Sequence, residues 1–293
     1  MRNIVAIIIL CLIAILQGCQ RQDSRQRNSS AEPTIAVSIV PQEWFVSRIG
    51  GDRVRTLVLA GPGQNPHNYE PTPKQISGLA EAKAWILSGT EFEISLLPKI
   101  GRLFPALTIV DGTAGVTFRR MDVHEDDDHD DFEHGIDRHT WLGSQAAKIL
   151  AGHIRDTLSA IDPDGAEQYG ENCRILSQDI DAEFDALRRE LAPLRGSTVY
   201  VYHPSFGYFL DEFGINQEAV ETGGKEPGPR ELARLIARAK EERPHAIFVQ
   251  AQFPVSAAKT VADAVGAATI ALDPRAPDWL ANIRLMGDAL RLE

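Results

Sequence analysis

Residues 164–191 read DGAEQYGENCRILSQDIDAEFDALRREL. Apolar side chains recur in this stretch at steps of three and four residues, with charged residues between them, which is the pattern of one amphipathic α-helix. The apolar positions are Ala166, Tyr169, Cys173, Leu176, Ile180, Phe184, Leu187 and Leu191. At 1.5 Å per residue, such a helix would be roughly 42 Å long, which is longer than one lobe is wide. We therefore predict a long helix that can join two lobes.

Short apolar runs alternate with helical patterns on both sides of this stretch. Before it, the predicted strands are residues 34–40, 54–59, 84–87 and 107–110, and the predicted helices are 73–82, 92–103 and 141–158. After it, the predicted strands are 198–202, 217–220, 245–250 and 267–272, and the predicted helices are 205–213, 229–242, 255–265 and 278–292. This alternation indicates βαβ units and parallel sheets. The predicted fold class is α/β, with two lobes joined by one long rigid helix.

The first residues have the features of an export signal. Arg2 is followed by an uncharged apolar run at residues 4–16, which is shorter than the roughly 20 residues that a membrane-spanning helix needs. Residues 16–19 (LQGC) resemble the bacterial lipobox, whose cysteine carries the lipid. We expect a lipoprotein signal peptide at residues 1–18, a lipid anchor on Cys19 and a polar, flexible tether at 19–33. The protein would then be exported and held at a bacterial membrane, facing the periplasm or the cell exterior.

Length and charge limit the remaining possibilities. With 293 residues, the chain is long enough for two lobes, which we place at residues 34–160 and 196–293, with the linking helix at 161–195. The formal net charge is −11 and no cluster of Lys and Arg is present, so a nucleic-acid partner is not expected. A cationic ligand fits this charge better.

An acidic, histidine-rich segment precedes the predicted helix at residues 141–158. Half of the eight histidines lie in it at five-residue intervals, a period that no regular helix or strand has. They are His124, His129, His134 and His139. The segment also carries nine carboxylates between residues 122 and 141. Imidazoles and carboxylates together are ligands for a divalent transition metal, although a solvated loop is the alternative interpretation.

Three further candidates lie where predicted strands end. His203 and Asp273 directly follow strands, and His67 lies between two prolines after another strand. Open α/β sheets bind ligands at the carboxyl ends of their strands. A loop histidine, a histidine bound to a backbone carbonyl and a turn aspartate remain the alternatives. Together with His139, these residues would supply three imidazoles and one carboxylate, enough for a tetrahedral zinc shell.

Four sequence segments, which occur in a fixed order, resemble those of a known family. Residues 65–73 (NPHNYEPTP), 137–142 (DRHTWL), 202–208 (YHPSFGY) and 272–274 (LDP) resemble the signatures of the zinc and manganese solute-binding proteins of ABC uptake transporters (cluster A-I). Residues 225–229 (KEPGP) resemble a fifth family segment. The chain departs from the pattern at Arg138, where proline is usual, and at Asn65, where an acidic residue is common.

The resemblance implies a metal site in a cleft between the two lobes. It assigns His67, His139, His203 and Asp273 as ligands. Histidine as the third of these ligands, His203, implies Zn²⁺ rather than Mn²⁺, in agreement with the preference of zinc for imidazole. Residues 122–137 would be an accessory loop, in which His124, His129 and His134 collect zinc weakly.

The expected function is therefore a high-affinity receptor that delivers Zn²⁺ to an ABC permease for import. The alternatives are a manganese or iron receptor of the same family and a metal-containing lipoprotein adhesin. A secreted zinc hydrolase is disfavoured because the sequence has neither a His-Glu-x-x-His motif nor a nucleophile elbow. We do not expect an enzyme.

Overall fold

A computed structural model describes residues 32–121, 135–221, 227–244, 246–250, 252–253 and 256–291. The predicted signal peptide, the tether up to residue 31 and Cys19 lie outside these residues, as do His124, His129 and His134. Those expectations stay predictions. Within the ranges that are described, no helix is long and apolar enough to cross a membrane.

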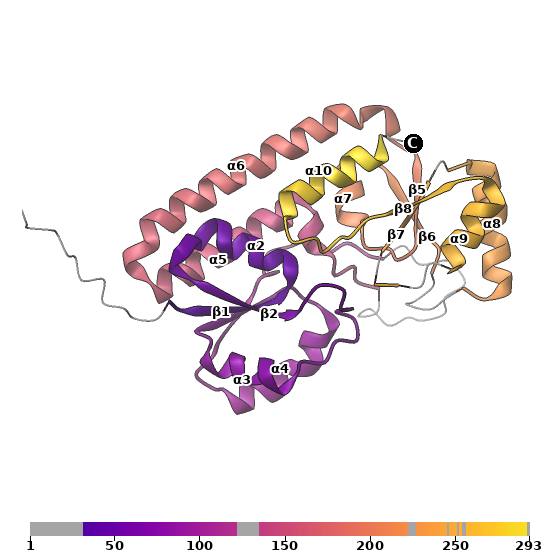
Figure 1. The fold of residues 1–293 in the computed structure, drawn as a ribbon. Coiled ribbons are helices and arrows are strands. Elements are labelled where there is room, and N and C mark those ends of the chain that lie inside the picture. The colour runs from indigo at the N-terminus through magenta and orange to yellow at the C-terminus, as the bar shows by residue number, and fades with distance from the viewer. Residues whose placement is uncertain are drawn as a thin grey trace, which may run out of the picture. The chain divides into compact units, whose positions relative to one another are not determined.

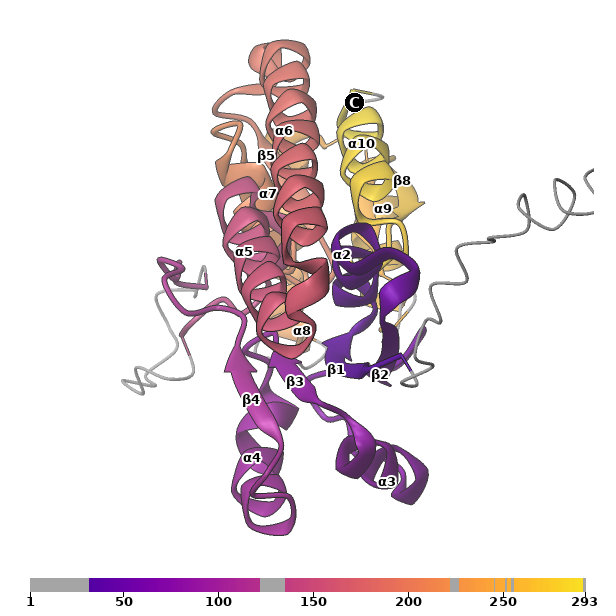
Figure 2. The same cartoon turned by 90° about the vertical axis from the view of Figure 1, so that its left-hand side faces the viewer.

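The first lobe is built on a four-stranded parallel sheet with the order β2-β1-β3-β4. Its strands are β1 (Thr34–Ile39), β2 (Arg55–Ala60), β3 (Ala84–Leu87) and β4 (Thr108–Asp111). Helices α3 (Pro73–Glu81) and α4 (Glu91–Leu103) cover one face, and α2 (Val40–Gly50) and α5 (Ser144–Ile161) cover the other (Figure 2). Strands covered on both faces read as continuous apolar runs, as β3 does.

The sequence prediction omits helix α2, and the structure gives the reason. The helix begins directly after β1, with Pro41 in its first turn and no intervening turn residues. The side chain of Gln42 accepts hydrogen bonds from the backbone N–H groups of Ser38 and Ile39 at 2.8 and 3.2 Å. It also donates to the carbonyl of Leu87 at 3.0 Å. The junction between β1 and α2 is thus held by a buried side chain, and it lacks the turn residues by which a sequence pattern would reveal it.

The second lobe repeats the topology of the first, with the parallel order β6-β5-β7-β8. Its strands are β5 (Thr198–Val201), β6 (Asn216–Ala219), β7 (Ala246–Val249) and β8 (Ala268–Ala271). Its helices are α7 (Gly207–Asp211), α8 (Pro229–Glu242), α9 (Ser256–Val265) and α10 (Trp279–Leu290). The predicted class, two α/β lobes with parallel sheets, is confirmed.

One continuous helix, α6 (Ala166–Glu190), connects the two sheets along the chain (Figure 1). Its 25 residues correspond to about 38 Å. It packs against α2 and α5 of the first lobe and against α10. The contact with α10 is close because Gly287 has no side chain: a Cβ there would lie 2.2 Å from Leu187 Cδ2. The long predicted helix is confirmed, whereas the exact lobe boundaries stay a prediction.

Candidate metal centre

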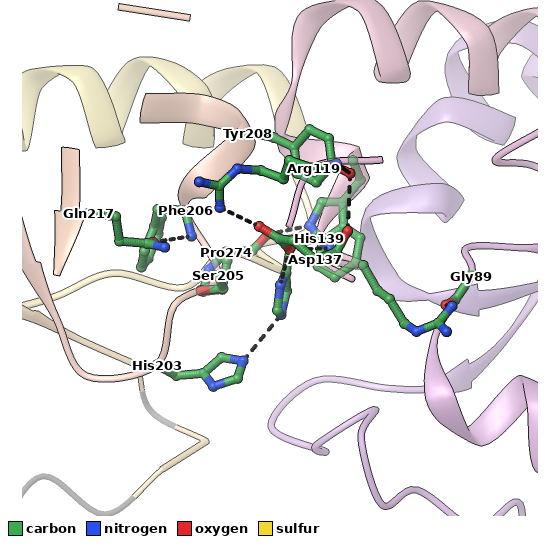
Figure 3. A network of polar contacts seen from close by, with 12 residues as sticks. Gly89, Arg119, Asp137, His139, His203, Ser205, Phe206, Tyr208, Gln217 and Pro274 are labelled. Atoms are coloured by element: carbon green, nitrogen blue, oxygen red, sulfur yellow. Dashed lines mark hydrogen bonds and ion pairs between the residues drawn. The ribbon is translucent and has the colours of Figure 1, made fainter. Parts of the chain in front are cut away.

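Three of the predicted ligands lie together in the structure. His67 lies in the loop after β2, His139 directly precedes the short 3₁₀ turn Thr140–Leu142, and His203 follows β5. The Nε2 atom of His203 lies 3.0 Å from that of His67 and 3.2 Å from that of His139. One nitrogen from each ring falls within 4.8 Å of the others, and no other such group occurs in the described part of the chain. Figure 3 shows the contact between the His139 and His203 rings.

The other nitrogen of each imidazole contacts a carboxylate. The three Nδ1–O distances are 3.0 Å for His67 with Glu91, 2.8 Å for His139 with Asp137 and 2.8 Å for His203 with Glu221. When Nδ1–H donates to the carboxylate, the lone pair of Nε2 is left to bind a metal. Each carboxylate therefore sets both the tautomer and the direction of its ring.

The spacing of the Nε2 atoms matches a zinc-sized ion. Zinc binds imidazole nitrogen at about 2.0–2.1 Å, so two nitrogens of a tetrahedral shell lie about 3.3 Å apart. The observed separations of 3.0 and 3.2 Å are close to this value. Three converging lone pairs would repel one another without a cation. The donor set is therefore complementary to one metal ion.

Two of the three histidines are buried, and this burial affects the protonation of the site. His139 and His203 are only 5% and 4% exposed, whereas His67 is partly exposed. Burial, followed by the neighbouring His139 and His67 rings, lowers the pKa of His203 well below its usual value. This imidazole is thus neutral at pH 7 and can bind a cation without first losing a proton.

The carboxylates of Asp137 and Glu91 behind the rings remain ionised. Burial would raise the pKa of Asp137, but hydrogen bonds from His139 and Arg119 outweigh it and hold that pKa below its usual value. Burial likewise opposes the effect of the hydrogen bond from His67 on Glu91, whose pKa is also lowered. Negative charge therefore lies directly behind imidazoles that would carry a cation.

Short side-chain-to-backbone turns shape the loops that carry His67 and His139. The Asn65 side chain accepts a hydrogen bond from the N–H of His67 at 3.0 Å, and Asp137 does the same for His139 at 2.9 Å. Arg138 donates to the carbonyl of Gly89 at 3.0 Å. The two departures from the family pattern thus have structural roles beside the site.

His203 is fixed from the neighbouring strand. Gln250, at the end of β7, accepts from the N–H of His203 at 3.2 Å and donates to its carbonyl at 2.7 Å. The ring of Phe253 stacks on the imidazole with a centroid separation of 4.5 Å. Strands β5 and β7 flank the point where the strand order reverses, which is where open α/β sheets bind ligands.

The structure does not bring the carboxylate of Asp273 into the histidine group. Its Oδ1 accepts hydrogen bonds from Gln252 Nε2 at 3.0 Å and from the N–H of Arg275 at 2.9 Å. Asp273 does follow β8, as the sequence indicates. Its role as a ligand stays a prediction.

A pocket that is partly open to solvent lies at the three histidines. Trp141 contributes to its wall, and its indole N–H donates to the carbonyl of Pro274 at 2.9 Å. Trp279 in turn donates to the carbonyl of Trp141 at 2.6 Å. These contacts join residues of both sequence halves around this pocket.

Sequence reasoning missed Glu91, Glu221, Asp137 and Gln250. Glu91 and Glu221 lie shortly after the ends of β3 and β6, so the rule that selected His203 and Asp273 could have found them. His153 lies outside the histidine group, and its Nε2 contacts the carbonyl of Ala114 at 2.8 Å.

Comparisons with known proteins give a consistent result. The family described as "ZnuA: Zinc-uptake complex component A periplasmic" matches residues 35–291. A crystal structure of ZnuA is 33% identical and superimposes with a TM-score of 0.81, covering 89% of this chain and 98% of that one. The periplasmic zinc-binding protein TroA of Treponema pallidum, at 18% identity and a TM-score of 0.77, covers 89% of this chain and 98% of its own and shares the fold.

Curated relatives include two with zinc in their names. The zinc-binding lipoprotein AdcA of Streptococcus pneumoniae serotype 4 is 26% identical over 259 residues, which is 86% of this chain and 52% of AdcA. The chain thus spans about half the length of this relative. The high-affinity zinc uptake system protein ZnuA of Yersinia pestis is 25% identical over 265 residues, which is 83% of each chain.

Proposed function

The chain belongs to the family of periplasmic zinc-uptake complex components (ZnuA), and we propose that it is a receptor that binds Zn²⁺ and delivers it to an ABC permease. The observation that carries this proposal is the convergence of three imidazole Nε2 atoms, each ring backed by its own carboxylate. His67, His139 and His203 are the proposed direct ligands of the transported ion.

The donor set favours zinc over the manganese alternative. Imidazole suits zinc, whereas the harder Mn²⁺ ion prefers carboxylate and carbonyl oxygens. All three grouped ligands are imidazoles, and their carboxylates contact the Nδ1 atoms on the far side of the rings. A manganese site would need carboxylates to replace imidazoles in direct contact with the metal.

Asp273 is the proposed fourth ligand. It stands after β8 as His203 stands after β5, at the carboxyl ends of strands in one sheet. Since Gln252 and the backbone of Arg275 hold Oδ1, ligation would use the other carboxylate oxygen. A shell closed by four protein ligands leaves no position for a reactive water, so it favours a binding protein over a hydrolase.

The parts outside the described residues complete the proposal. Cys19 would carry a lipid, and residues 20–33 would tether the body at the outer side of a bacterial membrane. His124, His129 and His134 would bind zinc weakly. No observation in the described residues supports the alternative of a metal-containing lipoprotein adhesin.

Competition calorimetry with Zn²⁺ and Mn²⁺ tests the function. We expect one tight site that prefers zinc. Tighter binding of Mn²⁺, or the absence of any tight site, would overturn the proposal.

A further inference from the structure

Arg119 lies between Asp137 and helix α7 of the second lobe (Figure 3). Its Nη1 donates to Asp137 Oδ2 at 2.8 Å, and its Nε donates to Asp211 Oδ2 at 2.9 Å. The Asp137 side chain is fully buried and that of Arg119 is 16% exposed, so water screens this ion pair little. One guanidinium thus connects the carboxylate behind His139 with the end of helix α7.

The two oxygens of Asp137 have separate partners. Oδ1 accepts from the backbone N–H and the ring Nδ1 of His139 at 2.9 and 2.8 Å, while Oδ2 accepts from Arg119. A carboxylate is planar, so holding Oδ2 also fixes the direction of Oδ1. The orientation of a ligating imidazole depends on the partner of its second nitrogen. The position of Arg119 is therefore transmitted to the His139 ring.

Backbone contacts hold Arg119 and Asp137 together. The N–H of Asp137 donates to the carbonyl of Arg119 at 3.0 Å, and Arg120 and Ile136 form an antiparallel bridge beside them. The hydroxyl of Tyr208 accepts from the N–H of Arg119 and donates to the carbonyl of Asp137, both at 3.0 Å. Burial raises the pKa of Tyr208 to about 12, so this hydroxyl keeps the proton that it donates.

Gly207 makes room for this arrangement. A Cβ at residue 207 would lie 1.8 Å from Arg119 Nη1 and 2.9 Å from Asp137 Oδ2. Gly207 and Tyr208 belong to segment 202–208, which also contains His203. Metal ligation uses only the histidine of that segment, whereas the glycine and the tyrosine hold the partner of a different ligand, His139.

We propose that Arg119 is a positioning residue for zinc, an inference that rests on the zinc site proposed above. Arg119 holds Asp137, Asp137 orients His139, and Tyr208 and Asp211 on α7 hold Arg119 in place. Separation of α7 from Arg119 removes two of these contacts and loosens one zinc ligand. The rate of zinc release is thereby linked to the separation of the lobes.

Stopped-flow zinc release into excess chelator tests this role on the full chain. We expect Arg119→Gln to release zinc about 10-fold faster, the lower end of the loss caused by removing an orienting partner of a ligand. The visible spectrum of the Co²⁺-loaded protein should change as well, because it reports the ligand geometry. Arg119→Lys should keep most of the wild-type release rate and most of the wild-type cobalt spectrum, since it keeps a positive charge beside Asp137.

Arg284→Gln is the matched control. Arg284 pairs with Glu183 at 2.6 Å and joins α10 to α6, and neither residue belongs to the metal site. This change should lower the melting temperature of the apoprotein without altering zinc release or the cobalt spectrum. The comparison separates a positioning role from a general loss of stability.

Tyr208→Phe is a second variant that keeps the aromatic ring and removes only the hydroxyl. It should also speed zinc release, even if Arg119→Gln does not fold. If the variants that fold release zinc at the wild-type rate with the wild-type cobalt spectrum, the positioning role is refuted and the zinc receptor stands. If the wild-type protein has no tight zinc site, the proposed function fails together with this inference.

Discussion

Replacing Glu221 by glutamine puts an amide in place of the carboxyl group behind a zinc ligand while it keeps the side-chain shape. Glu221 Oε1 lies 2.8 Å from His203 Nδ1, and the two side chains are only 3% and 5% exposed. Water therefore cannot readily take the place of the carboxylate. The amide oxygen of glutamine can still accept the hydrogen bond, so the ring keeps its orientation but becomes a weaker base.

The expected loss of zinc affinity is about 10- to 100-fold, the range typical of an altered orienting partner. This corresponds to about 1.4–2.7 kcal/mol of binding free energy. Competitive titration against a chromophoric zinc chelator at pH 7.5 measures the change. We expect Co²⁺ affinity to fall in parallel, because the same imidazole binds both ions.

Glu218→Gln is the matched control, because Glu218 lies on β6, three residues before Glu221. Glu218 pairs with Arg238 at 2.5 Å and is not a member of the histidine group. Its replacement should leave zinc affinity unchanged. If Glu221→Gln and Glu218→Gln bind zinc with the same affinity, the carboxylate does not tune His203 and the reasoning is wrong.

Three further predictions concern the ligands, pH and lobe motion. His203→Ala should lower zinc affinity by at least about 100-fold, more than the loss of an orienting partner, whereas His153→Ala should bind like wild type in the same titration. Because the pKa of His203 is lowered from 6.5 on folding, the unfolded chain takes up a proton below about pH 6.5 that the folded chain does not. The unfolding free energy of the apoprotein should therefore be highest above pH 6.5 and fall at lower pH, and His203→Gln should reduce this slope in urea titrations. Since α6 is continuous between the sheets, solution scattering should show only a small difference between apo and zinc-bound protein; a rotation by tens of degrees would contradict this.

The alternation of apolar runs and helical patterns was sufficient to predict both parallel sheets, and the apolar period of residues 164–191 was sufficient to predict the long helix. Helix α2 was not predicted, because the buried side chain of Gln42, rather than turn residues, separates it from β1. Such a contact depends on packing and leaves no pattern in the sequence.

The candidate site, like the fold, could be predicted in part from the sequence. Strand ends led to His67 and His203, and these two residues do lie with His139. The partners of their Nδ1 atoms are 24 and 18 residues away along the chain, so only the fold pairs them. Asp273 was predicted by the same rule as His203, but local hydrogen bonds turn its Oδ1 toward Gln252 and the backbone of Arg275.

X-ray absorption spectroscopy of the protein loaded with one equivalent of zinc tests the central claim directly. We predict three imidazole nitrogens and one oxygen at about 2.0–2.1 Å from the metal. His139→Ala and His67→Ala should each remove one imidazole from the spectrum. A wild-type shell with fewer than three imidazoles, or one made mainly of carboxylate oxygens, would contradict the proposed centre.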